Sequence, residues 1–389
     1  MKGKDKIIKI VSLFLFLSVI SFVCFRYSGQ VIYVFSHIAV KSALTYFPEK
    51  AFQKDTEAES TSSEKESETK KETEPTAKAE EKTTVTETKN TAVKDKAEKK
   101  EDFFVLPTDI SEMTKQAIKK VSGEEKGGTI LEKQYKNEGV TDKYGAVKIK
   151  NTNSTKINTE EILKEKADLK IVKDEPAVLI FHTHTTESYQ YIDRDYYAAN
   201  HPSRNNSSDR NMVRIGKAIA SQIEKAGYKV IHAEKIHDGK YSGAYSRSRQ
   251  TVEEYLKKYP SIKVVLDVHR DAIEQSSKVK IKPTATINGR KTAQVMIITG
   301  CQESNNAIEG FPNWRKNLTF AVHLQNEMEK SFPGLTRPVF FCPRKYNMDL
   351  TTCSLLLEIG SDANTLEEAY YAGLCVGKSV AQLLKKYEV

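Results

Sequence analysis

Residues 182–187 read HTHTTE and follow the short apolar run AVLIF, which ends at Phe181. They place two imidazoles, His182 and His184, close to the carboxylate of Glu187. Histidine and glutamate are common ligands of catalytic zinc, which takes three protein groups and keeps a fourth position for water. His184 and Glu187 are separated by two threonines, so a tight turn after a strand would let both face one ion. A polar loop without a metal is the simpler alternative.

Two other apolar runs also end in groups that could do chemistry. KVVLDV is followed by His269 and Arg270, and LLLEIG carries the carboxylate of Glu358. If these runs and AVLIF are neighbouring parallel strands, their ends meet at one edge of a sheet. His269 would then complete a ligand set with His184 and Glu187, and zinc would lower the pKa of a bound water. Glu358 is costly in a buried strand unless it is paired or used, and it suits a general base. An ion-pair cluster is the alternative for the DVHRD stretch.

The remaining histidines are interpreted as structural, because a single imidazole in an apolar context is usually satisfied by hydrogen bonds. They are His201, His232, His237 and His323.

The cysteines show no metal-binding spacing. Cys24 lies in an apolar N-terminal segment, and the other four have no CxxC pattern. We expect buried free thiols at Cys301, Cys342, Cys353 and Cys375, with a Cys342–Cys353 disulfide as the alternative.

The elements that position these groups alternate between strands and helices. Apolar runs at 177–181, 228–233, 263–268 and 354–360 predict strands, and amphipathic periods at 208–227, 249–259, 313–332 and 365–387 predict helices. Residues 279–300 predict two strands around an Asn288–Gly289 turn. We therefore predict an α/β fold: a mixed, mostly parallel sheet flanked by helices.

Composition divides the 389 residues into four parts. Residues 1–30 contain a basic start and the apolar segment 7–25, which predicts a transmembrane anchor with its N-terminus in the cytoplasm; a cleaved signal peptide is the alternative. Residues 31–102 predict a juxtamembrane segment and a disordered tether rich in Glu, Lys and Thr. Residues 103–170 are taken as an N-terminal extension of the outer domain, and 171–389 as the catalytic domain.

The net charge of +9 would suit an anionic partner. No nucleic-acid-binding motif is present, and an external, membrane-anchored domain would not meet nucleic acid. Anionic cell-wall polymers or lipid headgroups are the expected partners.

Four segments together resemble the stage II sporulation protein P family: VLIFHTHTTESY, NMVRIGKAIASQIEKAGYKV, VVLDVHRDA and LLLEIG. The resemblance covers roughly residues 140–389. It implies a fold like those of zinc amidases and zinc carboxypeptidases, and a zinc-dependent N-acetylmuramoyl-L-alanine amidase that acts on peptidoglycan. It also implies that the protein is located at the septal and engulfing membrane of a sporulating cell, and that its partners include a lytic transglycosylase. Some members are credited with endopeptidase activity.

The resemblance also implies roles for individual residues. His184 and His269 match zinc ligands, and Glu358 matches the catalytic glutamate. The middle ligand is either Glu187 or Asp209, because related amidases carry it about 15 residues after the first histidine; we prefer Glu187. His182 would then support a ligand through a hydrogen bond, and Arg270 would hold a substrate carboxylate or the oxyanion.

Two other functions fit the same residues. A degenerate amidase fold could bind the wall as a scaffold without catalysis, although an intact His184, His269 and Glu358 set argues against this. A zinc peptidase that acts on stem peptides would suit the HxxE spacing equally well.

Overall fold

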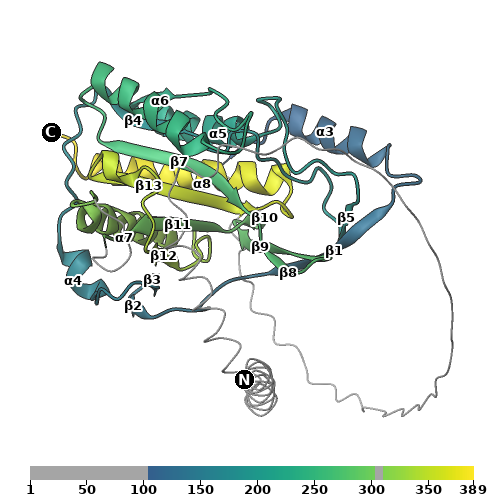
Figure 1. Ribbon diagram of the computed structural model, residues 1–389, viewed down its shortest axis with the longest axis horizontal. Helices are drawn as coiled ribbons and strands as arrows, with labels where there is room; N and C mark the ends of the chain where they lie inside the picture. The colour runs from purple at the N-terminus through teal and green to yellow at the C-terminus, as the bar shows by residue number, and fades with distance from the viewer. Residues whose placement is uncertain (1–103, 303–309) are drawn as a thin grey trace, which may run out of the picture. The chain divides into compact units, whose positions relative to one another are not determined.

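Eight strands form the central sheet of the computed structural model, which describes residues 104–302 and 310–389 (Figure 1). All neighbouring pairs are parallel except the outermost pair, β2–β3, and the central pair, β11–β13. The predicted mixed, mostly parallel sheet is therefore confirmed. In spatial order the strands are β2 (Asp142–Tyr144), β3 (Val147–Asn151), β12 (Val339–Cys342), β11 (Val295–Gly300), β13 (Cys353–Ser361), β7 (Val264–Asp271), β4 (Pro176–Phe181) and β6 (Lys229–His232).

Helices cover the two faces of this sheet unequally. On one face α5 (Met212–Lys225), α7 (Trp314–Ser331) and α8 (Leu366–Lys385) bury the large core that includes Ile180 and Leu266. On the other face α6 (Ala244–Lys258) covers β4 and β7 around Phe181 and Val265. Beyond α6, the same face of β11, β12 and β13 carries only a small cluster of Ile298, Cys342 and Leu356.

The helix starts follow from capping residues. Asn211 accepts a hydrogen bond from the Val213 amide at the start of α5, and Thr365 and Glu368 form a capping box at the start of α8. α6 begins at Ala244, five residues before the predicted start, after Gly243 in a left-handed conformation (φ 78°). Its first turns are polar, so no apolar period marked them.

A second sheet corrects the prediction of a single one. It contains β10, β9, β1 and β5 in that order, with β8 beside β9. The predicted Asn288–Gly289 turn is confirmed, with φ values of 51° and 82°. The run 279–300, however, makes three strands, because the chain passes at Gln294 from this sheet into β11 of the central one. The strands are β1 (Lys126–Lys133), β5 (Tyr196–Ala198), β8 (Glu274–Ser276), β9 (Val279–Ile287) and β10 (Arg290–Ala293).

The predicted N-terminal extension supplies strands to both sheets. β3 pairs with β12 in the central sheet, and β1 pairs with β9 in the second. The extension also contains α3 (Thr108–Ile118) and α4 (Thr159–Lys164), and η2 (Met348–Leu350) precedes β13. The boundary near residue 170 stays a prediction. Within 104–302 and 310–389, no helix is both long and apolar enough for a membrane span, and the predicted anchor and tether lie outside these residues.

The described cysteines are all buried thiols outside any disulfide, as expected, so Cys342 and Cys353 are not bonded to each other. The four histidines interpreted as structural each contact a protein group. His201 binds the Tyr189 carbonyl, His232 binds His182, His237 binds the His182 carbonyl and Thr251, and His323 binds the Glu165 carbonyl.

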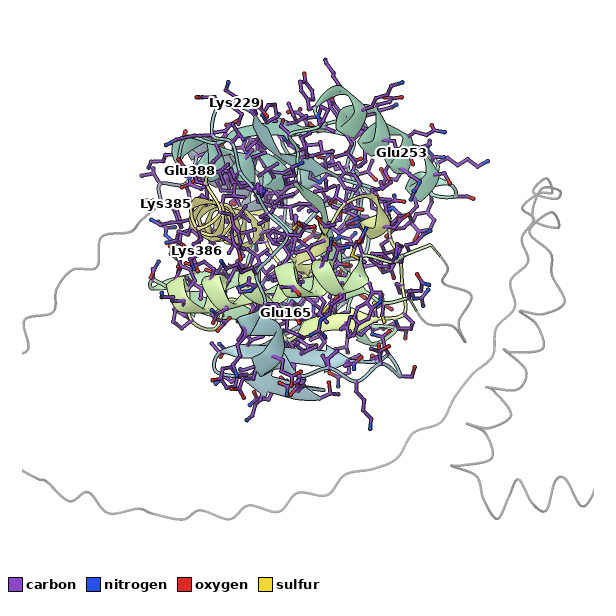
Figure 2. All side chains as sticks on the ribbon, turned by 90° about the vertical axis from the view of Figure 1, so that its left-hand side faces the viewer. Glu165, Lys229, Glu253, Lys385, Lys386 and Glu388 are labelled. Carbon is purple, nitrogen blue, oxygen red and sulfur yellow. The ribbon has the colours of Figure 1, made fainter. Side chains whose placement is uncertain are left out.

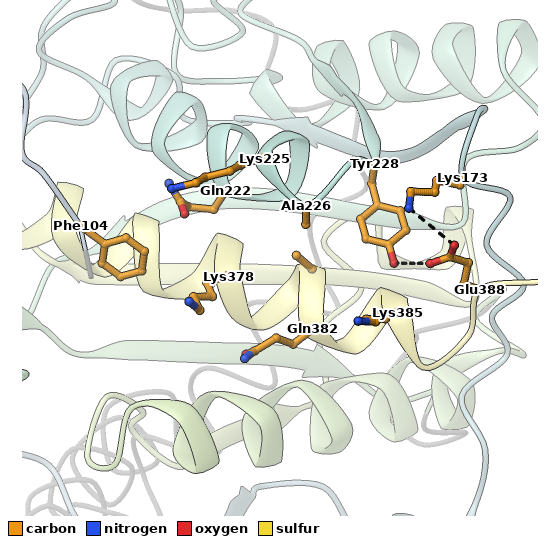
Figure 3. A pocket seen from close by; sticks show the side chains of 11 residues that line it. Phe104, Lys173, Gln222, Lys225, Ala226, Tyr228, Lys378, Gln382, Lys385 and Glu388 are labelled. Atoms are coloured by element: carbon orange, nitrogen blue, oxygen red, sulfur yellow. Dashed lines mark hydrogen bonds and ion pairs between the residues drawn. The ribbon is translucent and has the colours of Figure 1, made fainter. Parts of the chain in front are cut away.

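A pocket of about 400 Å³ lies between α5 and α8, far along both helices toward their C-terminal ends (Figure 3). Glu388 closes one end, where it accepts a hydrogen bond from Tyr228 and lies 3.9 Å from the Lys173 ammonium. Lys385, Lys386 and Glu388 lie together where α8 ends (Figure 2). None of the predicted active-site residues lines this pocket.

Candidate active site

The ends of β4, β7 and β13 meet as the sequence predicts, because these three strands are parallel neighbours. β4 ends at Phe181, and residues 183–186 form the expected turn. Asp238 fixes this turn by accepting hydrogen bonds from the backbone and hydroxyl of Thr186 and from Arg204. His184 and Glu187 therefore leave the strand on a rigid turn.

His269 lies between two carboxylates. Its Nδ1 is 3.6 Å from Oε2 of Glu187, and its Nε2 is 2.8 Å from Oδ1 of Asp267, although the Nε2 contact is not aligned as a hydrogen bond. Burial opposes the charged imidazole, but Asp267 and Glu187 outweigh it and raise the pKa of His269 well above its usual value. Burial likewise opposes ionisation of Glu187, but the contact with His269 lowers its pKa to about 2.

His184 is enclosed by aromatic rings. It stacks on Tyr241 at 4.9 Å between ring centroids, and it meets the rings of Tyr245 and His269 edge-on at 5.6 Å and 5.2 Å. Burial, followed by the nearby His269, lowers the pKa of His184, which favours the neutral imidazole. Its buried Nδ1 has no hydrogen-bond partner among the residues that the structure describes.

Glu358 stands beside His269 on the neighbouring strand. The two residues are registered partners in the β13–β7 ladder, so their side chains lie on the same face of the sheet. Burial raises the pKa of Glu358 to about 8, with Asp271 and Glu187 acting in the same direction and His269 against it. Its buried Oε2 has no partner in the described part of the chain. The carboxyl group can therefore gain or lose its proton close to neutral pH.

One detail of the predicted edge is wrong. His269 does not follow its strand but lies inside β7, which continues to Asp271. The reason is that β13 keeps pairing beyond Val268, through Glu358 with His269 and Ser361 with Asp271.

Three predicted residues point elsewhere. The Arg270 guanidinium donates to the carbonyls of Ser188 and Ser203, and a role toward an oxyanion stays a prediction. Asp209 accepts a hydrogen bond from Ser207 and pairs with Arg210. His269 pairs with Glu187 instead. His182 contacts the Val268 carbonyl and His232, rather than a predicted ligand.

Sequence reasoning missed the group that orients His269. Asp267 accepts hydrogen bonds from the backbone amide (2.8 Å) and the hydroxyl (2.6 Å) of Thr183. Its Oδ1 also lies 2.8 Å from Nε2 of His269. The signal was available, because a carboxylate two residues before a histidine lies on the same face of a strand. Tyr245 was also missed, and no sequence pattern indicates that α6 brings it to His184.

The side chains present fit a zinc ion by chemical type. The unpartnered Nδ1 of His184, Nδ1 of His269 and a Glu187 oxygen are the three kinds of donor that a catalytic zinc uses, and Asp267 behind His269 is a typical outer partner. Across residues 104–302 and 310–389, no three His, Cys, Asp or Glu side chains are already arranged to hold a metal ion.

Comparisons with solved structures find N-acetylmuramoyl-L-alanine amidases at low overall similarity. AmiC2 of Nostoc punctiforme is 10% identical with a TM-score of 0.32, covering 54% of this chain and 96% of that chain. Ami1 of Mycobacterium smegmatis is 10% identical with a TM-score of 0.33, covering 56% and 100%. The CwlD amidase from Clostridioides difficile, solved with the GerS lipoprotein, is 15% identical with a TM-score of 0.30, covering 54% and 98%.

The sequence comparisons are more specific. Stage II sporulation protein P of Bacillus subtilis (strain 168) is 31% identical over 207 residues, which are 50% of this chain and 48% of that relative. The chain thus aligns with about half the length of this curated relative. The family model for stage II sporulation protein P matches residues 105–381, which include both sheets and every residue of the candidate site. The chain therefore belongs to the stage II sporulation protein P family.

Proposed function

We propose that this protein is a cell-wall hydrolase that cleaves the amide bond between N-acetylmuramic acid and L-alanine in peptidoglycan during sporulation. Membership of the stage II sporulation protein P family supports the process and the substrate. The observation that carries the chemistry is the meeting of His184, Glu187 and His269 with Glu358 at three neighbouring strand ends.

Zinc is the proposed cofactor, held by His184, Glu187 and His269; when bound, it polarises the amide carbonyl and acidifies water. Asp267 keeps the His269 ring in one orientation through its own bonds to Thr183. Tyr241 and Tyr245 exclude water from two sides of the His184 ring.

Glu358 is the proposed general base and acid. Its unpartnered Oε2 is free to accept a proton from the attacking water and to return it to the amine of the leaving alanine. A pKa close to the working pH is best for both transfers, and burial moves the pKa of Glu358 in that direction.

The membrane anchor, an outward-facing catalytic domain and a lytic transglycosylase partner are part of the same proposal. They follow from the sequence of residues 1–102 and from the family. Endopeptidase activity on stem peptides is a second proposal, since the HxxE turn of His184 and Glu187 suits a zinc peptidase as well.

Product analysis tests the proposal. Digestion of purified peptidoglycan should release peptides with a new alanine amino terminus, and a chelator should stop the release. Freed D-amino acids would indicate a peptidase instead. Wall binding without any cleavage in the presence of zinc would favour the scaffold.

The Glu358→Gln variant tests the role of the carboxylate. We expect turnover to fall by about 10²–10⁴-fold, because proton transfer is lost, while bound zinc is unchanged. Glu367→Gln is the control and should digest normally, because the Glu367 side chain in the first turn of α8 is half-exposed. Full activity of Glu358→Gln would remove this residue from the mechanism.

A further inference from the structure

A cleft of about 470 Å³ opens directly beside Glu358. It lies on the same face of the central sheet as α6, over the strands β11, β12 and β13, which α6 does not cover. Met296, Ile298 and Phe340 form an apolar floor on β11 and β12, and Met296 is the registered neighbour of Glu358. The 135–139 segment and Lys150 of the N-terminal extension form a wall. A group bound in this cleft would therefore lie next to the proposed general base.

The two cations that line the cleft, Arg337 and Lys150, differ in whether they already pair with an acid of the protein. Arg337 donates to Asp271 at 2.8 Å and lies 4.8 Å from the Tyr135 ring centroid, so it is already paired. The Lys150 ammonium lies 5.4 Å from the Phe340 ring centroid, and no ion pair in the described residues includes it. Lys150 is exposed and can accept an anionic ligand.

Apart from Glu358, the acids that line the cleft are already paired within the protein. Glu138 accepts hydrogen bonds from two backbone amides and lies 3.7 Å from the Lys133 ammonium. Asp271 is bound by Arg337. Lys150 is therefore the cation of the lining that has no ion pair in the described residues, and an anionic ligand in the cleft would pair with it.

We propose that this cleft binds the peptide part of the substrate, a short acidic peptide with free carboxylates. Lys150 pairs with one carboxylate, and the floor of Met296, Ile298 and Phe340 receives the aliphatic part of the peptide. This inference deepens the proposed amidase function and rests on it. The cleft then fixes the direction of the substrate, with the peptide on the β11–β12 side of Glu358.

A glycan strand is the other class of ligand, and the cleft suits it less well. A sugar ring would need a free aromatic face, but Arg337 lies over the Tyr135 ring and the Tyr346 ring packs against Tyr245. Met296, Ile298 and Pro338 offer aliphatic contacts without hydrogen-bonding side chains for hydroxyl groups.

Calorimetric titration of the full-length chain, with chelator present so that nothing is cleaved, tests the proposal. The probes are a tripeptide of L-alanine, γ-linked D-glutamate and a diamino acid, the same peptide with carboxamides, and a peptide-free disaccharide. We expect Lys150→Met to raise the Kd of the acidic tripeptide about 5–10-fold, as for one charge-assisted contact, with Lys150→Arg close to wild type. Lys143→Met, which removes an exposed charge from neighbouring β2, is the control and should bind normally.

Two results would overturn the inference: an unchanged Kd in Lys150→Met, or a disaccharide that binds more tightly than the tripeptide. The test also separates this inference from the amidase proposal. Lys150-dependent peptide binding without chelator-sensitive cleavage would contradict only the amidase. Chelator-sensitive cleavage with Lys150-independent binding would contradict only the peptide site.

Discussion

At the scale of single residues, the site is marked by polar atoms that folding alone does not explain. Nδ1 of His184 and Oε2 of Glu358 are buried without a partner in the described residues. Leaving such an atom unsatisfied costs on the order of 1–3 kcal/mol. A ligand that binds both groups would recover that free energy. Other buried atoms, such as Oγ1 of Thr299, also lack a partner in the described residues, so it is the position of these two beside His269 that indicates a reaction site.

Asp267 is the most testable positioning residue. Asp267→Asn keeps the shape of the side chain but removes the charge that holds His269. We expect zinc affinity to fall about 10–100-fold, measured by competition with a chromophoric chelator. Asp349→Asn is the control, because Asp349 is a buried carboxylate paired with Arg249 elsewhere. Equal zinc affinity in both variants would show that Asp267 serves only the fold.

At the scale of elements, β4, β6 and α5 enclose a pair of neutral histidines. His182 Nδ1 contacts the Val268 carbonyl and must donate to it, so its Nε2 accepts from Nε2 of His232 at 2.9 Å. α5 can pack over this pair because it carries Gly216, where an added Cβ would lie 2.4 Å from His232. Burial lowers the pKa of His182 to about 3 and that of His232 to about 4.

This pair makes stability depend on pH. The unfolded chain protonates both imidazoles below their ordinary pKa near 6.5, whereas the folded chain does not until about pH 4. The stability they provide is therefore full above pH 6.5 and is lost as the pH falls from 6.5 toward 4. At pH 5 the loss is on the order of 2 kcal/mol for each imidazole.

Urea unfolding at pH 8 and pH 5, followed by the fluorescence of Trp314, measures this loss. His232→Gln removes one titrating group and should flatten the difference between the two pH values. His323→Gln on α7 should leave it unchanged. An unaltered difference in His232→Gln would contradict the assignment.

The contact between α5 and α8 gives a second prediction at this scale. An added Cβ at Gly377 would lie 2.3 Å from the Ile219 carbonyl oxygen, which belongs to the backbone of α5. We expect Gly377→Ala to lower the free energy of unfolding by about 1–3 kcal/mol, because the helices must separate. Gly239→Ala, which meets no atom within 4 Å, is the control in the same denaturation experiment. Stabilisation by Gly377→Ala would show that the helices separate freely.

At the scale of the whole molecule, charge favours contact with an anionic wall. The chain carries a net charge of +9, and exposed charges act over a distance that salt shortens, from about 10 Å at 0.1 M to about 3 Å at 1 M. We expect the bound fraction in sedimentation with purified cell walls to fall across this range. The Glu358→Gln variant keeps the wall intact during the measurement. Binding that does not change with salt would assign the affinity to specific contacts instead.

The types of the elements were predictable because burial imposes a period on the sequence. AVLIF and KVVLDV are largely apolar runs because both faces of β4 and β7 are covered. The α5 pattern follows one buried helix face, whereas α8 is apolar because most of its surface is buried. The division of 279–300 between two sheets was not predictable. It depends on β1, more than 140 residues earlier in the sequence, which pairs with β9.

The sequence by itself determined which residues could react and that they stand at or near the carboxyl ends of buried strands. His184, Glu187, His269 and Glu358 were identified because polar groups interrupt apolar runs there. Only the tertiary structure decided their partners: Asp267 behind His269, Glu187 rather than Asp209 beside it, and the guanidinium of Arg270 bound to the carbonyls of Ser188 and Ser203. The reason is physical. Burial acts on each residue locally and leaves a periodic trace, whereas strand order and register join residues far apart in the chain.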